Sequence, residues 1–168
     1  MKEDFIEEFE LIDDIISNTR SISKRLKPPF VLKEGLAIGL KRFGKSISSF
    51  YLTVHSTIDD EHKIDNQAIS NSYLILLEIM NNLMKHDQAI KVDLYLDLSE
   101  KGLEIVLNHD GIGMTMKEFI EKKEAEKGLG LSSIQSRLLV LNGTINMYHE
   151  KKKHITHIII PLAYDNEN

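Results

Sequence analysis

The pattern of apolar and polar positions along this chain begins with a long amphipathic segment. Residues 4–26 carry apolar side chains at helical spacing, with acidic residues gathered at the start. The double proline Pro28-Pro29 follows, and proline cannot continue a helix because it lacks an amide donor. The pattern therefore predicts a helix over residues 4–26. Its apolar stripe is wider than one surface helix needs, so we expect it to pack against a second copy of the chain.

The next part of the chain predicts a short helix, a strand and a long helix. Apolar residues over 36–43 predict the short helix, which should end near Gly44. Residues 49–55 alternate and are rich in aromatic and β-branched side chains, which favours a strand. After a polar connector, a helix is predicted from Asn66 to His86, because this stretch contains neither glycine nor proline.

The second half of the chain predicts two hairpins separated by a helix. Residues 91–98 alternate cleanly, which predicts a strand with one face in water, and residues 103–107 return after a turn. Apolar residues between 128 and 141 share one helical face, and strands are predicted at 144–149 and 155–162. The order β-α-β-β-α-β-β predicts an α/β two-layer sandwich with a mixed, mostly antiparallel sheet covered by helices on one face.

Composition and charge narrow the classes of function. The chain has 168 residues, of which 42% are hydrophobic and 28% charged, so it can bury the core of one globular domain. A net charge of −5 argues against nucleic acid as the main partner, because phosphate binding needs clustered basic residues. There is no cysteine, which excludes thiolate catalysis and disulfides. No apolar run reaches the roughly 18 residues of a membrane span, so we expect a cytoplasmic chain without membrane contact of its own.

The end of the predicted long helix carries the residues that suggest chemistry. Glu78, Asn82 and His86 are four residues apart, so they lie on one stripe of a helix. A carboxylate, an amide and an imidazole beside an apolar face could bind a metal ion and a polyphosphate. Taken alone, such an i,i+4 pair is more often a solvated surface pair, and the interpretation therefore depends on residues farther along the chain.

Two glycine pairs downstream strengthen that interpretation. Gly111 and Gly113 follow a predicted strand, and Gly128 and Gly130 precede a predicted helix. Glycine lets a ligand approach the backbone closely, and the start of a helix presents free N–H groups to an anion. The second pair therefore predicts a phosphate-binding turn.

In this order, these segments resemble the ATP-binding domain shared by sensor histidine kinases, type II topoisomerases, MutL proteins and Hsp90 chaperones (the GHKL or Bergerat fold). Glu78-x-x-x-Asn82-x-x-Lys85-His86 resembles the N box of histidine kinases, Asp110-Gly-Ile-Gly113 lies in the G1 box, and Gly128-Leu-Gly-Leu131 resembles the G2 box. The resemblance covers about residues 50–163. Residues 10–45 are similar to the end of the dimerisation helices that precede this domain in the branch with short nucleotide lids.

The resemblance implies ATP and Mg²⁺ as ligands and a role for each matching residue. Glu78 is the expected catalytic carboxylate, which would orient or activate the group that attacks the γ-phosphate. Asn82 is the expected Mg²⁺ ligand, and residues 114–127 would form a lid over the nucleotide. The other residues expected at the nucleotide are Lys85, His86, His109, Asp110, Gly111, Gly113, Gly128, Leu129, Gly130 and Leu131.

The segment expected to recognise adenine departs from the family pattern. The family uses an aspartate two residues before the first G1 glycine, and His109 stands at that position, next to Asp110. A neutral imidazole can accept a hydrogen bond, but it has a different reach and no negative charge. Three interpretations remain open: Asp110 contacts adenine, His109 contacts adenine, or the site does not bind ATP. The Gly-Thr pair usual before the last strand is also replaced, with Lys153-His154 nearby.

The function implied by the resemblance is the ATP-binding catalytic part of a two-component sensor histidine kinase. Such a protein would phosphorylate a histidine for transfer to a response regulator, and this chain would be free or the cytoplasmic part of a membrane-anchored sensor. The accepting histidine of the family lies on the first dimerisation helix, whereas the first histidine here is His55. The alternatives are a degenerate adaptor, or pseudokinase, that docks a signalling partner without ATP, and an anti-sigma-factor-type serine kinase.

Three further expectations concern the organisation of the chain. The predicted division places a dimerisation-like helical segment at residues 1–45 and the ATP-binding domain at residues 46–168. A homodimer is expected through the N-terminal helix. The remaining histidines lack metal-ligand spacing and are expected at the surface; they are His55, His62, His149, His154 and His157.

Overall fold

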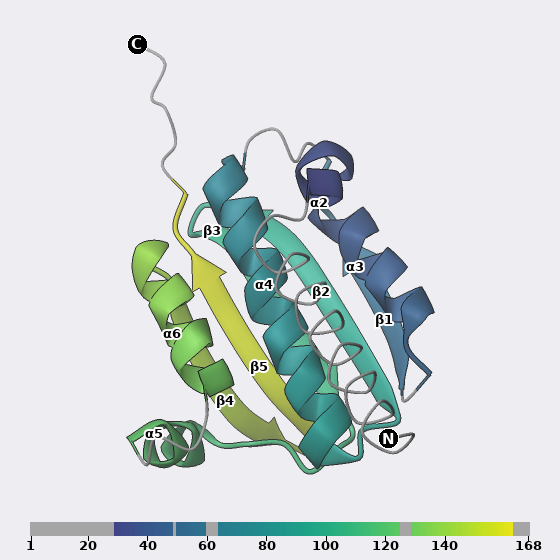
Figure 1. Cartoon of the computed structure of the whole chain (residues 1–168), viewed down its shortest axis with the longest axis vertical. Helices are drawn as coiled ribbons and strands as arrows, with labels where there is room; N and C mark the ends of the chain where they lie inside the picture. Colours follow the sequence, from purple (N-terminus) through teal and green to yellow (C-terminus); the bar gives the residue numbers. More distant parts are fainter. Residues whose placement is uncertain (1–28, 49, 60–63, 125–128, 163–168) are drawn as a thin grey trace, which may run out of the picture.

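The computed structural model describes residues 29–48, 50–59, 64–124 and 129–162 (Figure 1). The helix predicted over residues 4–26, and with it the predicted dimer contact, lies outside these residues. The described elements are α2 (Pro29–Glu34), α3 (Leu36–Ser46), β1 (Tyr51–Ser56), α4 (Asn66–Asn82), the π-helical turn η2 (Leu83–Asp87), β2 (Lys91–Ser99), β3 (Gly102–His109), α5 (Met116–Glu124), α6 (Leu129–Val140), β4 (Thr144–Glu150) and β5 (Lys153–Ile160).

The described strands form one five-stranded sheet in the order β1-β2-β3-β5-β4. β1 and β2 are parallel, because the connection between them passes through α4, while the other three neighbouring pairs are antiparallel. Helices α3, α4 and α6 lie on the same face of this sheet (Figure 1). The predicted two-layer sandwich, with its mixed and mostly antiparallel sheet, is confirmed.

The core lies between the sheet and these helices. Leu94, Ile105 and Ile158 come from three neighbouring strands and are at most 1% exposed, as expected for alternate residues that face a helical layer. The opposite face of the sheet is exposed to solvent at Tyr95, as predicted. Asp93 departs from that prediction, because it is buried beside the ammonium groups of two lysines. The N–O distances are 3.5 Å to Lys91 and 3.8 Å to Lys153.

The segment after the double proline continues as helix. α2 begins at Pro29, which suits the first turn of a helix because the amide hydrogen missing from proline has no partner there. In α3, Leu36 and Leu40 are fully buried in the same core as the strands. The division predicted at residue 45 stays a prediction. Helix α3, most of which precedes that boundary, packs in the same core as the strands.

Helix α4 begins as predicted and ends differently. The carboxylate of Asp65 accepts a hydrogen bond from the Ala68 amide at 2.8 Å, which caps the helix start. The α-helix ends at Asn82, four residues before the predicted end, and continues as η2. Gln88, at a φ of 50°, closes this turn. No helix among the described residues is both long and apolar enough to cross a bilayer.

Candidate functional site

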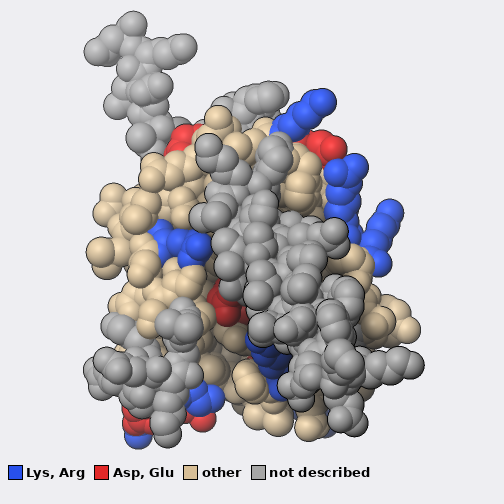
Figure 2. Space-filling view, in the orientation of Figure 1, with Lys and Arg blue, Asp and Glu red and all other residues tan. Residues whose placement is uncertain are grey.

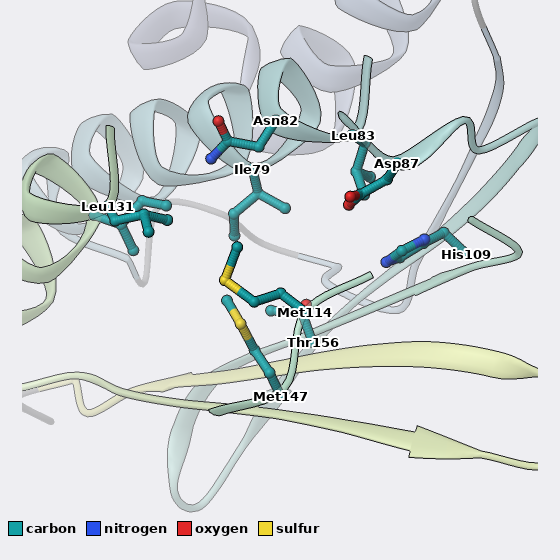
Figure 3. A pocket seen from close by; sticks show the side chains of 10 residues that line it. Ile79, Asn82, Leu83, Asp87, His109, Met114, Leu131, Met147 and Thr156 are labelled. Atoms are coloured by element: carbon teal, nitrogen blue, oxygen red, sulfur yellow. The ribbon is translucent and has the colours of Figure 1, made fainter. Parts of the chain in front are cut away.

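A cavity opens between the end of α4, the η2 turn, strands β3 to β5 and helix α6 (Figure 3). Its lining combines apolar side chains with a few polar ones, which is the usual composition of a small-molecule site. Asn82 and Leu131 lie toward one end of it, and Asp87 and His109 lie toward the other (Figure 3). The lining residues are Ile79, Asn82, Leu83, Asp87, His109, Met114, Leu131, Ile134, Met147 and Thr156.

The Asn82 end, defined here by Glu78, Asn82, Gly130 and Leu131, joins α4 to the first turn of α6. Asn82 and Leu131 line the cavity, and Glu78 lies one helical turn before Asn82. A Cβ atom at position 130 would collide with the Glu78 carboxylate, so glycine allows the start of α6 to approach this acid. The structure therefore brings together three elements predicted from sequence: the carboxylate, the amide and the glycine turn.

Lys85 and His86 do not line the cavity. Both are exposed and belong to the η2 turn. A π-helical turn places i→i+5 partners above one another, so the predicted stripe of residues four apart does not continue from Asn82 to His86. The residue that the turn presents to the cavity is Asp87, for which the sequence spacing gave no signal.

The His109 end is defined here by His109, Asp87 and the loop of residues 110–113. His109, at the end of β3, is only 4% exposed, and its Nδ1 atom has no hydrogen-bond partner among the described residues. Burial and, to a smaller extent, the nearby His154 lower the pKa of His109 to about 4. The imidazole is therefore neutral at pH 7, with one nitrogen that donates and one that accepts.

Asp87 gives this end a carboxyl group. Its side chain is half-buried and lines the same end of the cavity as His109 (Figure 3). Burial raises the pKa of Asp87, whereas positive charge on Lys122, His86 and His154 acts in the opposite direction. A carboxyl group whose pKa is raised inside a cavity is a candidate for ligand contact.

His154 contradicts the prediction of a surface histidine. It is half-buried between two other rings, with centroids 5.5 Å from His109 and 4.6 Å from His149, and its Nδ1 atom is buried without a partner in the described part of the chain. Burial lowers the pKa of His154, and His149 adds to this effect. The prediction was wrong because the antiparallel register pairs His154 with His109.

The other histidines have less bearing on the cavity. His55 is exposed and stacks on Tyr95, and His149 is exposed. His157 is half-buried, and its Nε2 lies 2.6 Å from a carboxylate oxygen of Glu104. His62 lies outside the described residues. Within the described ranges no three histidine, aspartate or glutamate side chains are grouped so that they could hold a metal ion.

The loop that follows His109 is held by its own glycines and by Asp110. The Asp110 carboxylate accepts hydrogen bonds from the amides of Ile90 at 2.8 Å and Lys91 at 2.9 Å, which lower its pKa. Asp110 thus ties the loop to the start of β2 and does not line the cavity. A Cβ at Gly111 would meet the backbone oxygen of Asp87, and one at Gly113, whose φ is 70°, would meet the His154 ring.

The segment predicted to be a lid is helical from Met116 to Glu124. Thr115 and Glu118 form a capping box at its start, in which the Thr115 amide donates to the Glu118 carboxylate at 2.8 Å. Phe119 is 2% exposed and anchors this helix. The lid role stays a prediction. Gly128 lies outside the described residues, and the structure describes only the backbone of Leu129.

Among the described residues, the cavity lining contains neither lysine nor arginine, although Lys122 acts on the lining residue Asp87. In the space-filling view several basic side chains lie over α2 and α3 at the upper right, and others lie farther left and toward the lower edge (Figure 2). The only basic residue of α6, Arg137, donates to the backbone oxygen of Ser133 at 3.1 Å.

Comparison with protein families gives a match over more than half of the chain. Residues 69–164 match the family described as histidine kinase-, DNA gyrase B- and HSP90-like ATPase. The matched range contains both ends of the cavity.

Two curated relatives match a longer part of the chain. The chain is 26% identical over 141 residues to the sensor histidine kinase ComP of Bacillus subtilis, covering 82% of this chain and 18% of that protein. It is also 26% identical over 140 residues to the oxygen sensor histidine kinase NreB of Staphylococcus carnosus, covering 82% and 38% respectively. The chain thus spans well under half of the length of either relative.

Solved structures of histidine kinases share the fold. The blue-light activated histidine kinase of Erythrobacter litoralis superposes with a TM-score of 0.64 at 17% identity, covering 90% of this chain and 52% of that one. The ATP-binding domain of PrrB from Mycobacterium tuberculosis gives a TM-score of 0.59 at 16% identity, covering 77% and 92%. At these identities the likeness concerns the fold alone.

Proposed function

Because this chain belongs to the histidine kinase-, DNA gyrase B- and HSP90-like ATPase family, we propose that it is the ATP-binding catalytic part of a two-component sensor histidine kinase. The observation that carries the proposal is the Asn82 end of the cavity. There the Glu78 carboxylate rests against Gly130 at the start of α6, one turn from Asn82. An acid, an amide and a helix start in contact are suited to a polyphosphate and to the group that attacks it.

Each of these groups has a distinct part in phosphoryl transfer. The N–H groups at the start of α6 bind phosphate oxygens, since a helix start favours negative charge. Glu78 orients the attacking group and accepts its proton. The γ-phosphoryl group passes to that nucleophile as its bond to the β-phosphate oxygen breaks, and ADP leaves.

Asn82 fits the role of a magnesium ligand. Its side chain lines the cavity and carries a neutral oxygen, and Mg²⁺ in nucleotide sites is held by few protein groups together with water and phosphate oxygens. When bound, Mg²⁺ neutralises charge on the phosphates.

The partners follow from this chemistry. Mg·ATP is the phosphoryl donor, and the acceptor is a histidine on a separate dimerisation helix, because the first histidine of this sequence is His55. A response regulator then takes the phosphoryl group from that histidine. The curated relatives are named as sensor histidine kinases, which supports this assignment, and we place the dimer contact in the N-terminal helix.

A second candidate function is a degenerate adaptor that docks a signalling partner without binding ATP. His109 favours it, because a buried neutral imidazole stands where the family carries an aspartate. This candidate predicts that the fold is retained and nucleotide is not bound.

Calorimetric titration with ATP separates the two candidates. We expect binding in the presence of Mg²⁺, and weaker binding by about tenfold for Asn82→Ala, which corresponds to roughly 1.4 kcal/mol. Asn82→Asp keeps an oxygen ligand and serves as the matched control. No heat of binding at millimolar ATP with Mg²⁺, from protein that melts cooperatively, would reject the kinase and favour the adaptor.

A further inference from the structure

We propose that the face of the sheet turned away from the helices is a pairing surface for a second copy of this chain. Leu94 and Ile105 are buried on the helical side of the sheet. Successive side chains of a strand point to opposite faces, so Tyr95 and Val106 lie on the other side, here called the open face. The inference goes beyond the proposed nucleotide chemistry and does not depend on it.

The centre of the open face is apolar and aromatic. Tyr95 on β2 is paired with Val106 on β3, and Tyr148 on β4 is paired with Ile155 on β5. The two tyrosines are 42% and 39% exposed, and Val106 and Ile155 are only half-buried. A central apolar surface with charged residues around it is the usual composition of a protein interface.

One end of the open face, here called the lysine end, is positively charged. The ammonium groups of Lys91 and Lys153 lie 3.5 Å and 3.8 Å from the same carboxylate oxygen of Asp93. Two ammonium groups that share one carboxylate leave a net positive charge. The exposed lysines Lys151 and Lys152 adjoin this end in the turn between β4 and β5.

The opposite end, here called the carboxylate end, is negatively charged. Asp97 on β2 is paired directly with Glu104 on β3. Asp97 is exposed and accepts a hydrogen bond from the Thr57 hydroxyl, and Glu104 lies 2.6 Å from Nε2 of His157. Like charges directly opposite one another destabilise a sheet, so a cation brought from outside would relieve a repulsion that the fold leaves in place.

The two ends make the open face complementary to itself. A twofold axis that lies in the plane of the face and crosses the strands places the lysine end of one copy on the carboxylate end of the other. Lys91 of each copy then faces Asp97 of the second copy, and the apolar centres meet between these contacts. A twofold axis along the strands would place lysine on lysine, so the charges select the first arrangement.

The dimensions of the open face suit a weak dimer. Its five strands give a width of about 24 Å, and the stretch from Lys91 to Asp97 is about 20 Å long. Each copy would bury on the order of 500 Å², which is near the lower limit of specific interfaces. The cavity is lined by residues of α4 and α6 on the helical side of the sheet, so pairing leaves it open to a ligand.

Sedimentation velocity of the full chain over a range of concentrations tests the inference. We expect the average mass to rise with concentration, and the association constant to fall by about tenfold between about 0.05 M and about 0.5 M NaCl, because salt screens the paired charges. Lys91→Glu should weaken association by at least about tenfold, and so should Asp97→Lys, because each creates two repulsive contacts across the twofold axis.

The double variant and a charge-matched control make the test specific. Lys91→Glu combined with Asp97→Lys restores unlike charges at both contacts, so its association constant should return to within about threefold of the wild type. Lys45→Glu makes the same change of charge at an exposed residue of α3 and should leave association unaltered. The predicted contact of the N-terminal segment is present in every variant, so differences between them report the open face.

The inference is overturned if the wild type and both single variants associate equally, or if the double variant associates no better than the single ones while melting cooperatively. Wild-type chain that stays at one mass and binds polyglutamate, with binding lost in Lys91→Glu, would assign the face to an acidic partner and also overturn it. Asp97→Lys, at an exposed side chain, decides the matter if Lys91→Glu fails to fold. Failure to bind nucleotide would reject the proposed function and leave this inference intact.

Discussion

The Asn82 end and the His109 end of the cavity draw their polar groups from different kinds of structure. At the Asn82 end, Glu78 and Asn82 come from one regular helix, and Gly130 lets a second helix approach them. At the His109 end, the groups come from a π-helical turn and two strands, and two buried nitrogens have no partner in the described part of the chain.

This difference shows how freely each end can vary. Phosphoryl transfer needs a carboxylate, an amide and a helix start in fixed relation, and helical spacing supplies that relation. A base can be recognised by several donor and acceptor sets, so the His109 end tolerates new residues as long as they fill the space. By the resemblance described above, the Asn82 end matches the family pattern, whereas the His109 end keeps the two glycines and departs from the pattern at His109.

The largest expected effect comes from Glu78→Gln. This change keeps the shape of the side chain and removes its capacity to take a proton, so ADP formation from Mg·ATP should fall by roughly 10²–10⁴-fold. Nucleotide affinity should stay close to that of the wild type, measured by calorimetry. A loss of affinity equal to the loss of rate would show that Glu78 binds nucleotide instead of acting on it.

Lowering the pH should destabilise the protein through protonation of His109. The folded pKa of His109 is about 4, below its ordinary value of 6.5, so the unfolded chain binds more protons between these values and stability rises with pH across that range. Between pH 4 and pH 6.5, this residue should raise the free energy of unfolding by up to about 3 kcal/mol. His154 adds to the slope, since its pKa is also lowered, and Asp87, whose pKa is raised, opposes it.

Urea unfolding at several pH values checks this prediction with His109→Gln. The variant should flatten the rise of stability with pH, whereas His55→Gln, at an exposed ring, should not. An unchanged slope in His109→Gln would mean that protonation of this end is not linked to folding.

Gly130→Ala should disturb the Asn82 end alone. The added Cβ meets the end of the flexible Glu78 side chain, so the carboxylate moves while the fold is kept. We expect ADP formation to fall by about tenfold, roughly 1.4 kcal/mol, with little change in melting temperature. Gly44→Ala, also in a helix and beside the Leu52 side chain at 3.1 Å, is the matched control and should leave the rate unaltered.

Asp65→Ala should affect both ends equally. It removes the cap of α4, whose carboxylate bonds the Ala68 amide, and should lower the free energy of unfolding by about 1 kcal/mol. The affinity for ATP should not change, because neither end loses a contact. Asp65→Asn retains a capping oxygen and should stay within a few tenths of a kcal/mol of the wild type. Chemical unfolding gives the values.

The fold was predictable because its signals are periodic. Alternation around Leu94 and Ile105 gave the central hairpin, and the spacing of Leu131, Ile134 and Leu138, all now buried, gave α6. The start of α4 at Asn66 was likewise predicted. The start of α2 at Pro29 differs from the prediction, because a proline after a helical segment predicts an end, although proline also favours a first turn.

The His109 end was less predictable for two physical reasons. A five-residue π-helical turn leaves no period in the sequence, so the arrival of Asp87 at the cavity had no signal. The stack of His154 on His109 depends on the register between β3 and β5, and alternation alone does not fix which residues pair. The Asn82 end needed only the spacing of Glu78 and Asn82 within one helix.

The π-helical turn makes the length of the chain, and not only its composition, a determinant of this cavity. A turn with i→i+5 bonding holds one residue more than a turn of α-helix. Deleting one codon within Leu83–Asp87 should let α4 continue regularly and rotate the carboxylate at its end away from the cavity. Ligand preference could therefore change by a single in-frame deletion, a step that a comparison of substitutions alone would overlook.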